Sequence, residues 1–246
     1  MQSEQVLSYH NDPALKSRFT AHVERHRQED MVFQGTYGDV VDGSWRGCAV
    51  ACSLRSLDEI EGRPLQRDNR SHVDLAKRLG IPLQLAYLED KIFEGLPRKE
   101  ALSWPTRFAQ AIPVGADMSL VWPRFALWLL VDPDAGVLRF ARTVPVQRAI
   151  SGVAALFARQ IAGEMVTLQE WRTARSDAAA AAYAAADAAY AAYADADAAA
   201  AAYAAAYADA AAYAAADAAA AAAAAAARTT HYKLMAAKLL QLMSAA

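Results

Sequence analysis

Apolar residues recur at helical spacing through most of the first 166 residues. Leu15, Phe19 and Val23 stand four apart after Asp12-Pro13, a pair that suits a helix start because Asp caps free amides and Pro fits the first turn. Similar stripes predict helices at residues 48–57, 71–80 and 83–95, around Phe108, and at 145–162. No clear run alternates polar and apolar residues, and Val137–Phe140 is only a short strand candidate. The pattern therefore predicts an all-α body over residues 1–166.

The most apolar stretch of this body runs from Met118 to Val131. Its only clearly polar side chains are Ser119 and Arg124, too few to form a solvent-facing stripe. We therefore expect this stretch to be the most buried helix, with Trp122 or Trp128 in the core.

A second region, residues 167–246, is rich in Ala, Tyr and Asp. Thr167 to Glu170 reads as a capping box, in which a hydroxyl is followed three residues later by a carboxylate. Beyond it the sequence falls into repeats of ten residues, with tyrosines at 183, 193, 203 and 213. Ala fills most of the remaining positions and is the best helix former. The region is therefore predicted to form long helices rather than a disordered tail.

The ten-residue period does not match one straight helix that faces one partner. Ten residues turn a helix through about 1000°, about 80° short of three turns, so the Tyr stripe drifts around it. The repeat is then either a record of DNA expansion, or a broken helix whose pieces meet different neighbours. Tyr232 to Met243 again has one apolar face, which needs a core. We expect the tail to fold back as closely packed, Ala-faced helices, breaking at Asp195-Ala196-Asp197 or, as second choice, at Asp209, and to return its last helix to the body.

Charge and composition exclude several classes of protein. The net charge is −2 over 246 residues, which gives no overall attraction to nucleic acid or to an acidic membrane. No stretch reads as a membrane span or as a secretory signal. The two cysteines are only four residues apart, so we expect reduced thiols and no disulfide framework. These features predict a cytoplasmic protein that binds neither membranes nor nucleic acid.

The segment from Phe33 to Leu54 is the strongest candidate for chemistry. It contains four of the eleven glycines and both cysteines, and Cys48 stands where a helix begins. Free amides at a helix start and the nearby Arg46 would stabilise a thiolate there. Gln34 could donate to an oxyanion, and His72 is the nearest following base. This order predicts a thiol enzyme only loosely, because a buried packing role is the commoner fate of a free cysteine.

Other candidate residues surround this hypothesis. Tyr37 and Arg46 would lie at the rim of the pocket, whereas Cys52 is expected to pack. Glu89 and Asp90, with Glu94, form an acidic patch that could pair with Arg107 or act in acid-base chemistry; a solvated helix face is the simpler interpretation. No cysteine and histidine spacing is typical of a metal site, and no phosphate loop or dinucleotide motif is present. We therefore predict no metal and no cofactor.

Several stretches together resemble an uncharacterised protein family of bacteria and phages whose members carry an Ala-rich repetitive tail. They are SYHNDP (8–13), QGTY (34–37), GCAVAC (47–52), LGIP (79–82), LAYLEDKIFEGLP (85–97), GADMSLV (115–121) and the closing YKLMAAKLLQLM. The resemblance covers most of the chain and implies an intracellular, phage-linked protein with no established activity. Similar members read GCAVGC followed by a His, where this chain has Ala51 and then Arg55, which weakens any mechanism that needs a nearby His.

Two functions follow as expectations. The first is an all-α interaction or scaffold protein that binds a protein partner, or a second copy of itself, through the Ala/Tyr tail. The alternative is a thiol-dependent hydrolase or transferase with Cys48 as nucleophile, His72 as base and Gln34 as oxyanion donor. The unusual tail favours the first.

Overall fold

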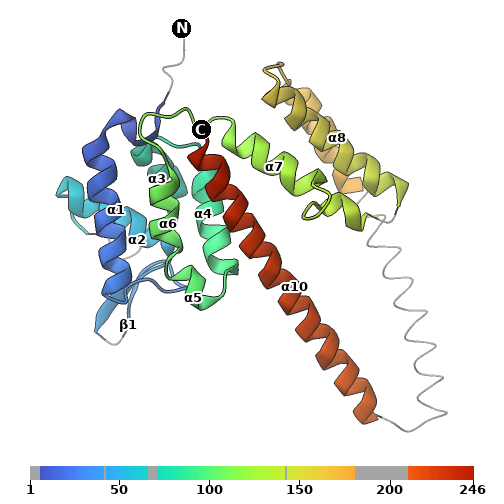
Figure 1. Ribbon diagram of the computed structural model, residues 1–246, viewed down its shortest axis with the longest axis horizontal. Coiled ribbons are helices and arrows are strands. Elements are labelled where there is room, and N and C mark those ends of the chain that lie inside the picture. Colours follow the sequence, from blue (N-terminus) through green and yellow to red (C-terminus); the bar gives the residue numbers. More distant parts are fainter. Residues whose placement is uncertain (1–5, 42, 66–70, 142, 181–209) are drawn as a thin grey trace. The chain divides into compact units, whose positions relative to one another are not determined.

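The computed structural model describes residues 6–41, 43–65, 71–141, 143–180 and 210–246. The chain separates into two compact units. Unit 1 combines Met1–Phe125 with Thr229–Ala246, and unit 2 is Ala126–Arg228. The all-α prediction is confirmed, because the described residues are mostly helical and contain one small sheet of two strands (Figure 1).

The helices expected from the apolar pattern are present in unit 1, together with a short 3-10 helix, two short strands and one further short helix (Figure 1). They are η1 (Ser8–Asn11), α1 (Pro13–Gln28), β1 (Asp39–Val41), β2 (Ser44–Arg46), α2 (Ala49–Glu61), α3 (His72–Leu79), α4 (Leu83–Gly95), α5 (Arg98–Ala101) and α6 (Trp104–Ala111). Helix α7 (Val121–Val131) continues into unit 2, where η2 (Val137–Phe140) and α8 (Val144–Ile161) follow. Residues 168–180 are helical, and α10 (Ala210–Ser244) ends the chain.

Helix ends lie where capping chemistry places them. The Asp12 side chain accepts the amide of Ala14 at 2.8 Å and starts α1. Ser71 accepts the amide of Asp74 at 3.0 Å and starts α3, which ends at Gly80 in the left-handed conformation. The Thr167–Glu170 capping box is also formed, with Glu170 accepting the Thr167 amide at 2.8 Å. These predictions from sequence are confirmed.

The expectation that Met118–Val131 is the most buried helix is wrong. Nine of the thirteen residues of α2 are buried, whereas Trp122 and Trp128 of α7 are only half-buried. The fully buried tryptophan is Trp104, at 0% exposure. Helix α2 contacts α1, α3, α4 and α6, and its many Ala and Ser residues let these neighbours approach closely. Hydropathy ranks how apolar a helix is, but it carries no information about how many neighbours surround it.

The small sheet also departs from the sequence prediction. No alternating run marked residues 30–47 in the sequence, but β1 and β2 pair antiparallel there, with Asp39 opposite Arg46. An isolated parallel bridge joins Val32 to Gly47. The strand candidate Val137–Phe140 forms the 3-10 helix η2 instead. Strands of three residues are too short to show a period of two against the surrounding glycines.

The last residues of α10 belong to unit 1. Leu239 and Met243 are fully buried, and Lys233 forms an ion pair with Glu100 at 2.5 Å. The Tyr232 ring lies so close to Gly95 that a Cβ atom there would be 2.2 Å from it. The proposed chain breaks at Asp195–Asp197 and at Asp209 lie outside the described residues. Among the described helices, none combines the length and apolarity needed to cross a membrane.

Candidate functional site

Cys48 is the N-cap of α2, at the helix start expected from the sequence. Its side chain is only 1% exposed. Burial raises the pKa of the thiol to about 12, and the opposing effect of the Ala51 and Val50 amides is smaller. At neutral pH the group is therefore a thiol, which weighs against a nucleophilic role. Cys52 is buried as well, with its sulfur 3.4 Å from the Gly47 carbonyl oxygen.

The two proposed partners of Cys48 have other contacts. The Gln34 amide donates to the carbonyl oxygens of Phe93 at 2.7 Å and Leu96 at 2.9 Å, which ties the glycine-rich segment to the end of α4. Nε2 of His72 is 3.3 Å from a carboxylate oxygen of Asp90, and its ring stacks on Tyr87 with centroids 4.5 Å apart. Both side chains thus have structural roles that need no substrate.

Glu89 is buried rather than solvated, so the simpler interpretation of the acidic patch is wrong for this residue. Its side chain is 1% exposed and accepts the Ser53 hydroxyl at 2.9 Å. Burial raises the pKa of the Glu89 carboxyl to about 8, and the neighbouring Asp90 charge acts in the same direction. At pH 7 most molecules therefore carry Glu89 as a neutral acid in the core.

The remaining residues of the sequence hypothesis are spread over the surface of unit 1. Tyr37 is exposed, and Arg46 forms an ion pair with Asp30 at 3.1 Å. Glu94 accepts the Gly35 amide at 3.0 Å. Arg107 is exposed on α6 and forms no ion pair with any described residue, so the expected pairing with the acidic patch is not formed.

A different feature of unit 1 points to a site. Three consecutive residues other than glycine, Tyr9, His10 and Asn11, have positive φ angles of 51°, 51° and 57°. The left-handed conformation costs an L-residue roughly 1–2 kcal/mol, somewhat less for Asn. Such strain persists only where the surroundings hold the backbone in place, and it concentrates at functional sites.

Hydrogen bonds from Ser8 and Tyr9 to residues 109–116 hold this turn in place. The Ser8 hydroxyl donates to the Pro113 carbonyl oxygen at 2.5 Å and accepts the Ala116 amide at 2.9 Å. Tyr9 is fully buried, and its hydroxyl donates to the carbonyl oxygen of Ala109 at 2.8 Å. Tyr9 and Ser8 thus anchor the strained turn in the core, which leaves His10 and Asn11 exposed.

Two glycines let other backbone segments of the protein approach the strained turn at Tyr9–Asn11 closely. A Cβ atom on Gly80, at φ +64°, would lie 2.3 Å from the Leu7 carbonyl oxygen. A Cβ atom on Gly115, at φ +70°, would lie 2.3 Å from the side-chain oxygen of Asn11. Any other residue would combine backbone strain with a clash at either position. These two glycines therefore allow the strained turn to pack between the end of α3 and the residues that precede α7.

The imidazole of His10 is oriented by the backbone. Its Nε2 lies 3.1 Å from the carbonyl oxygen of Arg78, which can only accept, so we assign the proton of the neutral ring to Nε2. Nδ1 is then left as an acceptor. Arg78 is itself held by Asp58 at 2.7 Å and Glu61 at 3.1 Å, so the carbonyl that positions His10 is on an anchored residue.

His10 and Asn11 line a groove of about 1050 Å³, which we name the His10 groove. Its floor includes the buried apolar residues Ile81 and Met118, and its rim carries the exposed Lys77 and Asp117. An apolar floor with a few polar groups around it is typical of a binding site. Among the described residues that line it, none is aromatic and none is an arginine, so these residues support neither stacking of a base nor bidentate binding of a phosphate.

Sequence reasoning missed this groove, although its parts were visible. SYHNDP, LGIP and GADMSLV, three of the stretches that carry the family resemblance, meet there from positions far apart in the chain. Nothing in the apolar pattern singles out His10 as a binding residue. The sequence shows a polar cluster at Tyr9–Asn11 and two distant stretches that contain Gly80 and Gly115, and nothing in it places the three together.

Comparison with protein-family models, with curated proteins and with solved structures finds nothing that matches this chain.

Proposed function

We propose that the protein is a binding protein rather than an enzyme, and that unit 1 binds a peptide segment of a protein partner in the His10 groove. The observation that carries this proposal is the strained turn at Tyr9–Asn11, held by Ser8 and Tyr9 so that two polar side chains face the groove. Backbone strain of this kind is compensated elsewhere in the fold and is kept where it serves a function.

A peptide suits the chemistry of the groove better than a nucleotide or a small apolar ligand does. Ile81 and Met118 offer an apolar floor, while Lys77 and Asp117 offer opposite charges on the rim. Nδ1 of His10 can accept a hydrogen bond from a backbone amide or a side-chain donor. The groove volume, about 1050 Å³, lies just above the usual range for small-molecule sites, roughly 300–1,000 Å³, which leaves room for several residues in extended form.

Selection from a random-peptide display library against the immobilised full-length protein tests this proposal. Binding of the enriched peptides is then measured by fluorescence anisotropy with the wild type and with Lys77→Glu. We expect that reversing this rim charge weakens binding about tenfold or more for peptides with an acidic residue. Lys99→Glu, the same change at an exposed position of α5 that does not line the groove, is the matched control and should have no effect.

His10→Asn tests the orientation argument separately, because Asn tolerates the left-handed conformation but lacks the imidazole acceptor. We expect weaker binding with an unchanged fold. If no peptide is enriched, or if enriched peptides bind Lys77→Glu and His10→Asn as tightly as the wild type, the proposed function is wrong.

A further inference from the structure

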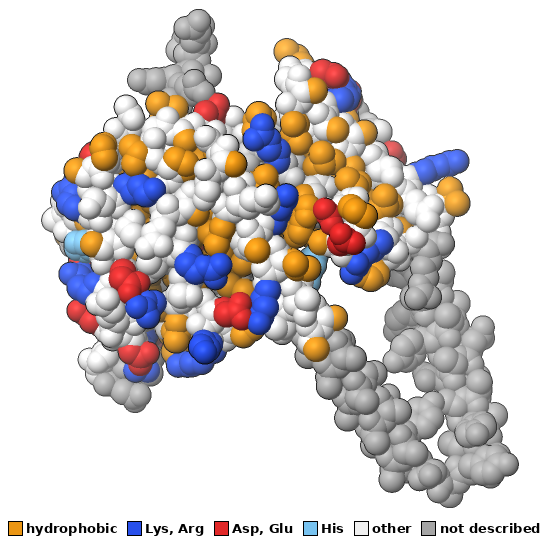
Figure 2. All heavy atoms as spheres, in the orientation of Figure 1, with side chains coloured by type: hydrophobic (Ala, Val, Ile, Leu, Met, Phe, Trp, Pro, Cys, Tyr) orange, Lys and Arg blue, Asp and Glu red, His pale blue; other side chains and the backbone are white. Residues whose placement is uncertain are grey.

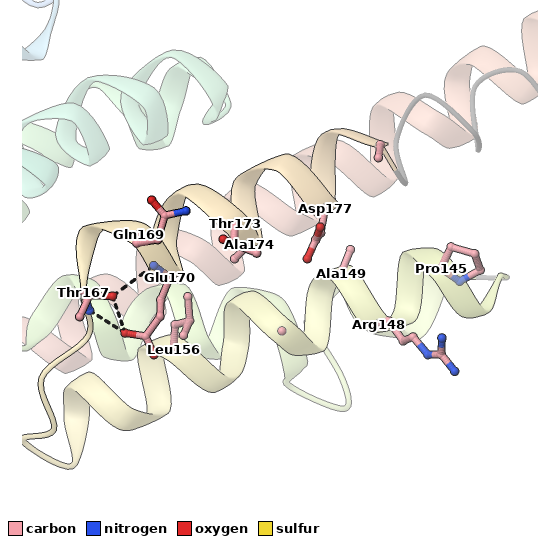
Figure 3. Close-up of a pocket in the computed structure, with 12 residues that line it drawn as sticks. Pro145, Arg148, Ala149, Leu156, Thr167, Gln169, Glu170, Thr173, Ala174 and Asp177 are labelled. Atoms are coloured by element: carbon pink, nitrogen blue, oxygen red, sulfur yellow. Dashed lines mark hydrogen bonds between the residues drawn. The ribbon is translucent and has the colours of Figure 1, made fainter.

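Unit 2 contains a second groove, between α8 and the 168–180 helix. It has a volume of about 730 Å³ and we name it the α8 groove. Figure 3 shows its two walls, with Ala149 on α8 and Thr173 and Ala174 on the facing helix. Small side chains at these positions would allow another helix to approach closely, since the distance between packed helices depends on the side chains at the contact.

The two helices that form this groove are held together at one end. The rings of Phe157 and Trp171 are in contact, with centroids 4.8 Å apart. Arg159 of α8 forms an ion pair with Glu170 at 2.6 Å, and Glu170 also closes the capping box with Thr167 (Figure 3). These contacts fix α8 and the 168–180 helix against each other at this end of the groove.

The walls of the groove carry opposite charges that have no ionic partner among the described residues. Arg148 lies on α8 and Asp177 lies on the facing helix, and both are exposed (Figure 3). Among the described residues, neither forms an ion pair or a hydrogen bond with a side chain. One positive and one negative group on opposite walls make the surface complementary to itself, because a twofold axis would place each Arg148 opposite the Asp177 of the other copy.

We propose that the α8 groove is the interface of a homodimer, in which α8 of each copy seats in the groove of the other and each Arg148 pairs with the Asp177 of the partner. A second copy is the occupant because it supplies both charges in the required arrangement. Large apolar side chains that unit 2 leaves exposed, Met165 and Leu168 at the turn between the two helices, are available to extend the contact. This interface lies in unit 2 and does not depend on the His10 groove in unit 1.

A charge swap tests the proposal on the full-length chain. Sedimentation equilibrium gives the dimer dissociation constant of the wild type, Arg148→Asp, Asp177→Arg and the double variant. Either single change brings like charges together twice in one dimer and should raise the dissociation constant about tenfold or more. The double variant restores opposite charges in reversed order and should return the constant to within about threefold of the wild type.

A steric pair of variants tests the groove without using charge. A Cβ atom on Gly152 would meet no other atom within 4 Å, so Gly152→Leu can be accommodated by the fold while filling the groove. Ala158→Leu is the matched control, because residue 158 is exposed and lies about 240° further around α8. We expect Gly152→Leu, but not Ala158→Leu, to give a monomer, with circular dichroism unchanged in both. A wild-type chain that stays monomeric, or a double charge swap that fails to restore the dimer, would overturn the proposal.

Discussion

The buried carboxyl of Glu89 gives the sharpest quantitative test of the structure. Its side chain is 1% exposed, its Oε1 accepts the Ser53 hydroxyl at 2.9 Å, and its Oε2 has no hydrogen-bond partner. The substitution Glu89→Gln keeps the size and the neutral state of the group while removing its ability to ionise. Any effect that grows with pH can then be assigned to the ionisation of this carboxyl.

The sign of the effect follows from proton binding in the two states. Burial raises the pKa of Glu89 from 4.5 in the unfolded chain to about 8 in the folded protein, so the folded state binds the proton more tightly. The contribution of the group to stability is therefore complete below pH 4.5 and is lost as the pH rises through 8. At 1.36 kcal/mol per pKa unit, the wild type would lose up to about 5 kcal/mol across this range at this site.

Urea unfolding at pH 5, 6, 7 and 8 measures this loss. The free energy of unfolding of Glu89→Gln minus that of the wild type should rise by about 1.3 kcal/mol between pH 6 and 7, and less steeply towards pH 5 and pH 8. Other titrating groups, such as the buried His26, contribute to both curves and cancel in the difference. Glu29→Gln, at an exposed position of the C-cap of α1, controls for the loss of one carboxyl group. Parallel curves for wild type and Glu89→Gln would refute the assignment of a protonated acid in the core.

Four further outcomes follow from single side chains. Iodoacetamide should modify Cys48 far more slowly in the native protein than in urea at pH 7, because burial raises the pKa of the thiol; rapid modification of the native protein would instead favour the thiol enzyme. His10→Gly should stabilise the protein by up to about 1 kcal/mol in thermal unfolding, by relieving left-handed strain, and should weaken peptide binding. Ser71→Ala should lower the free energy of unfolding by about 1 kcal/mol, because α3 loses its cap. Iodide should leave one tryptophan unquenched, and Trp104→Phe should remove that protected fraction.

Helix ends were predictable because their causes are local. Asp12, Ser71 and Gly80 each act on amides or carbonyls within a few residues, so the sequence alone carries the information. Burial was not predictable in the same way. The residues 118–131 are more apolar than α2, yet α2 is more buried because it has four helical neighbours.

The candidate site was even less predictable from the sequence than burial was. The position of Cys48 at a helix start was predicted correctly, but the effect of burial on its pKa depends on neighbours that are distant in sequence. The His10 groove is composed of three such distant stretches, and its strained turn depends on Ser8 bonding to residues more than a hundred positions away. A propensity argument cannot predict a left-handed Tyr9, because Tyr alone disfavours that conformation.

The division of the chain explains how a low-complexity repeat can coexist with a well-packed unit. Unit 1 takes residues from both ends of the chain, so unit 2 is an insertion between Phe125 and Thr229. The closing segment contributes Leu239 and Met243 to the core of unit 1 through its own apolar face. Truncating one buried Leu to Ala in this segment would cost about 2–5 kcal/mol. The stability of unit 1 therefore depends on the apolar face of the last helix and constrains its sequence.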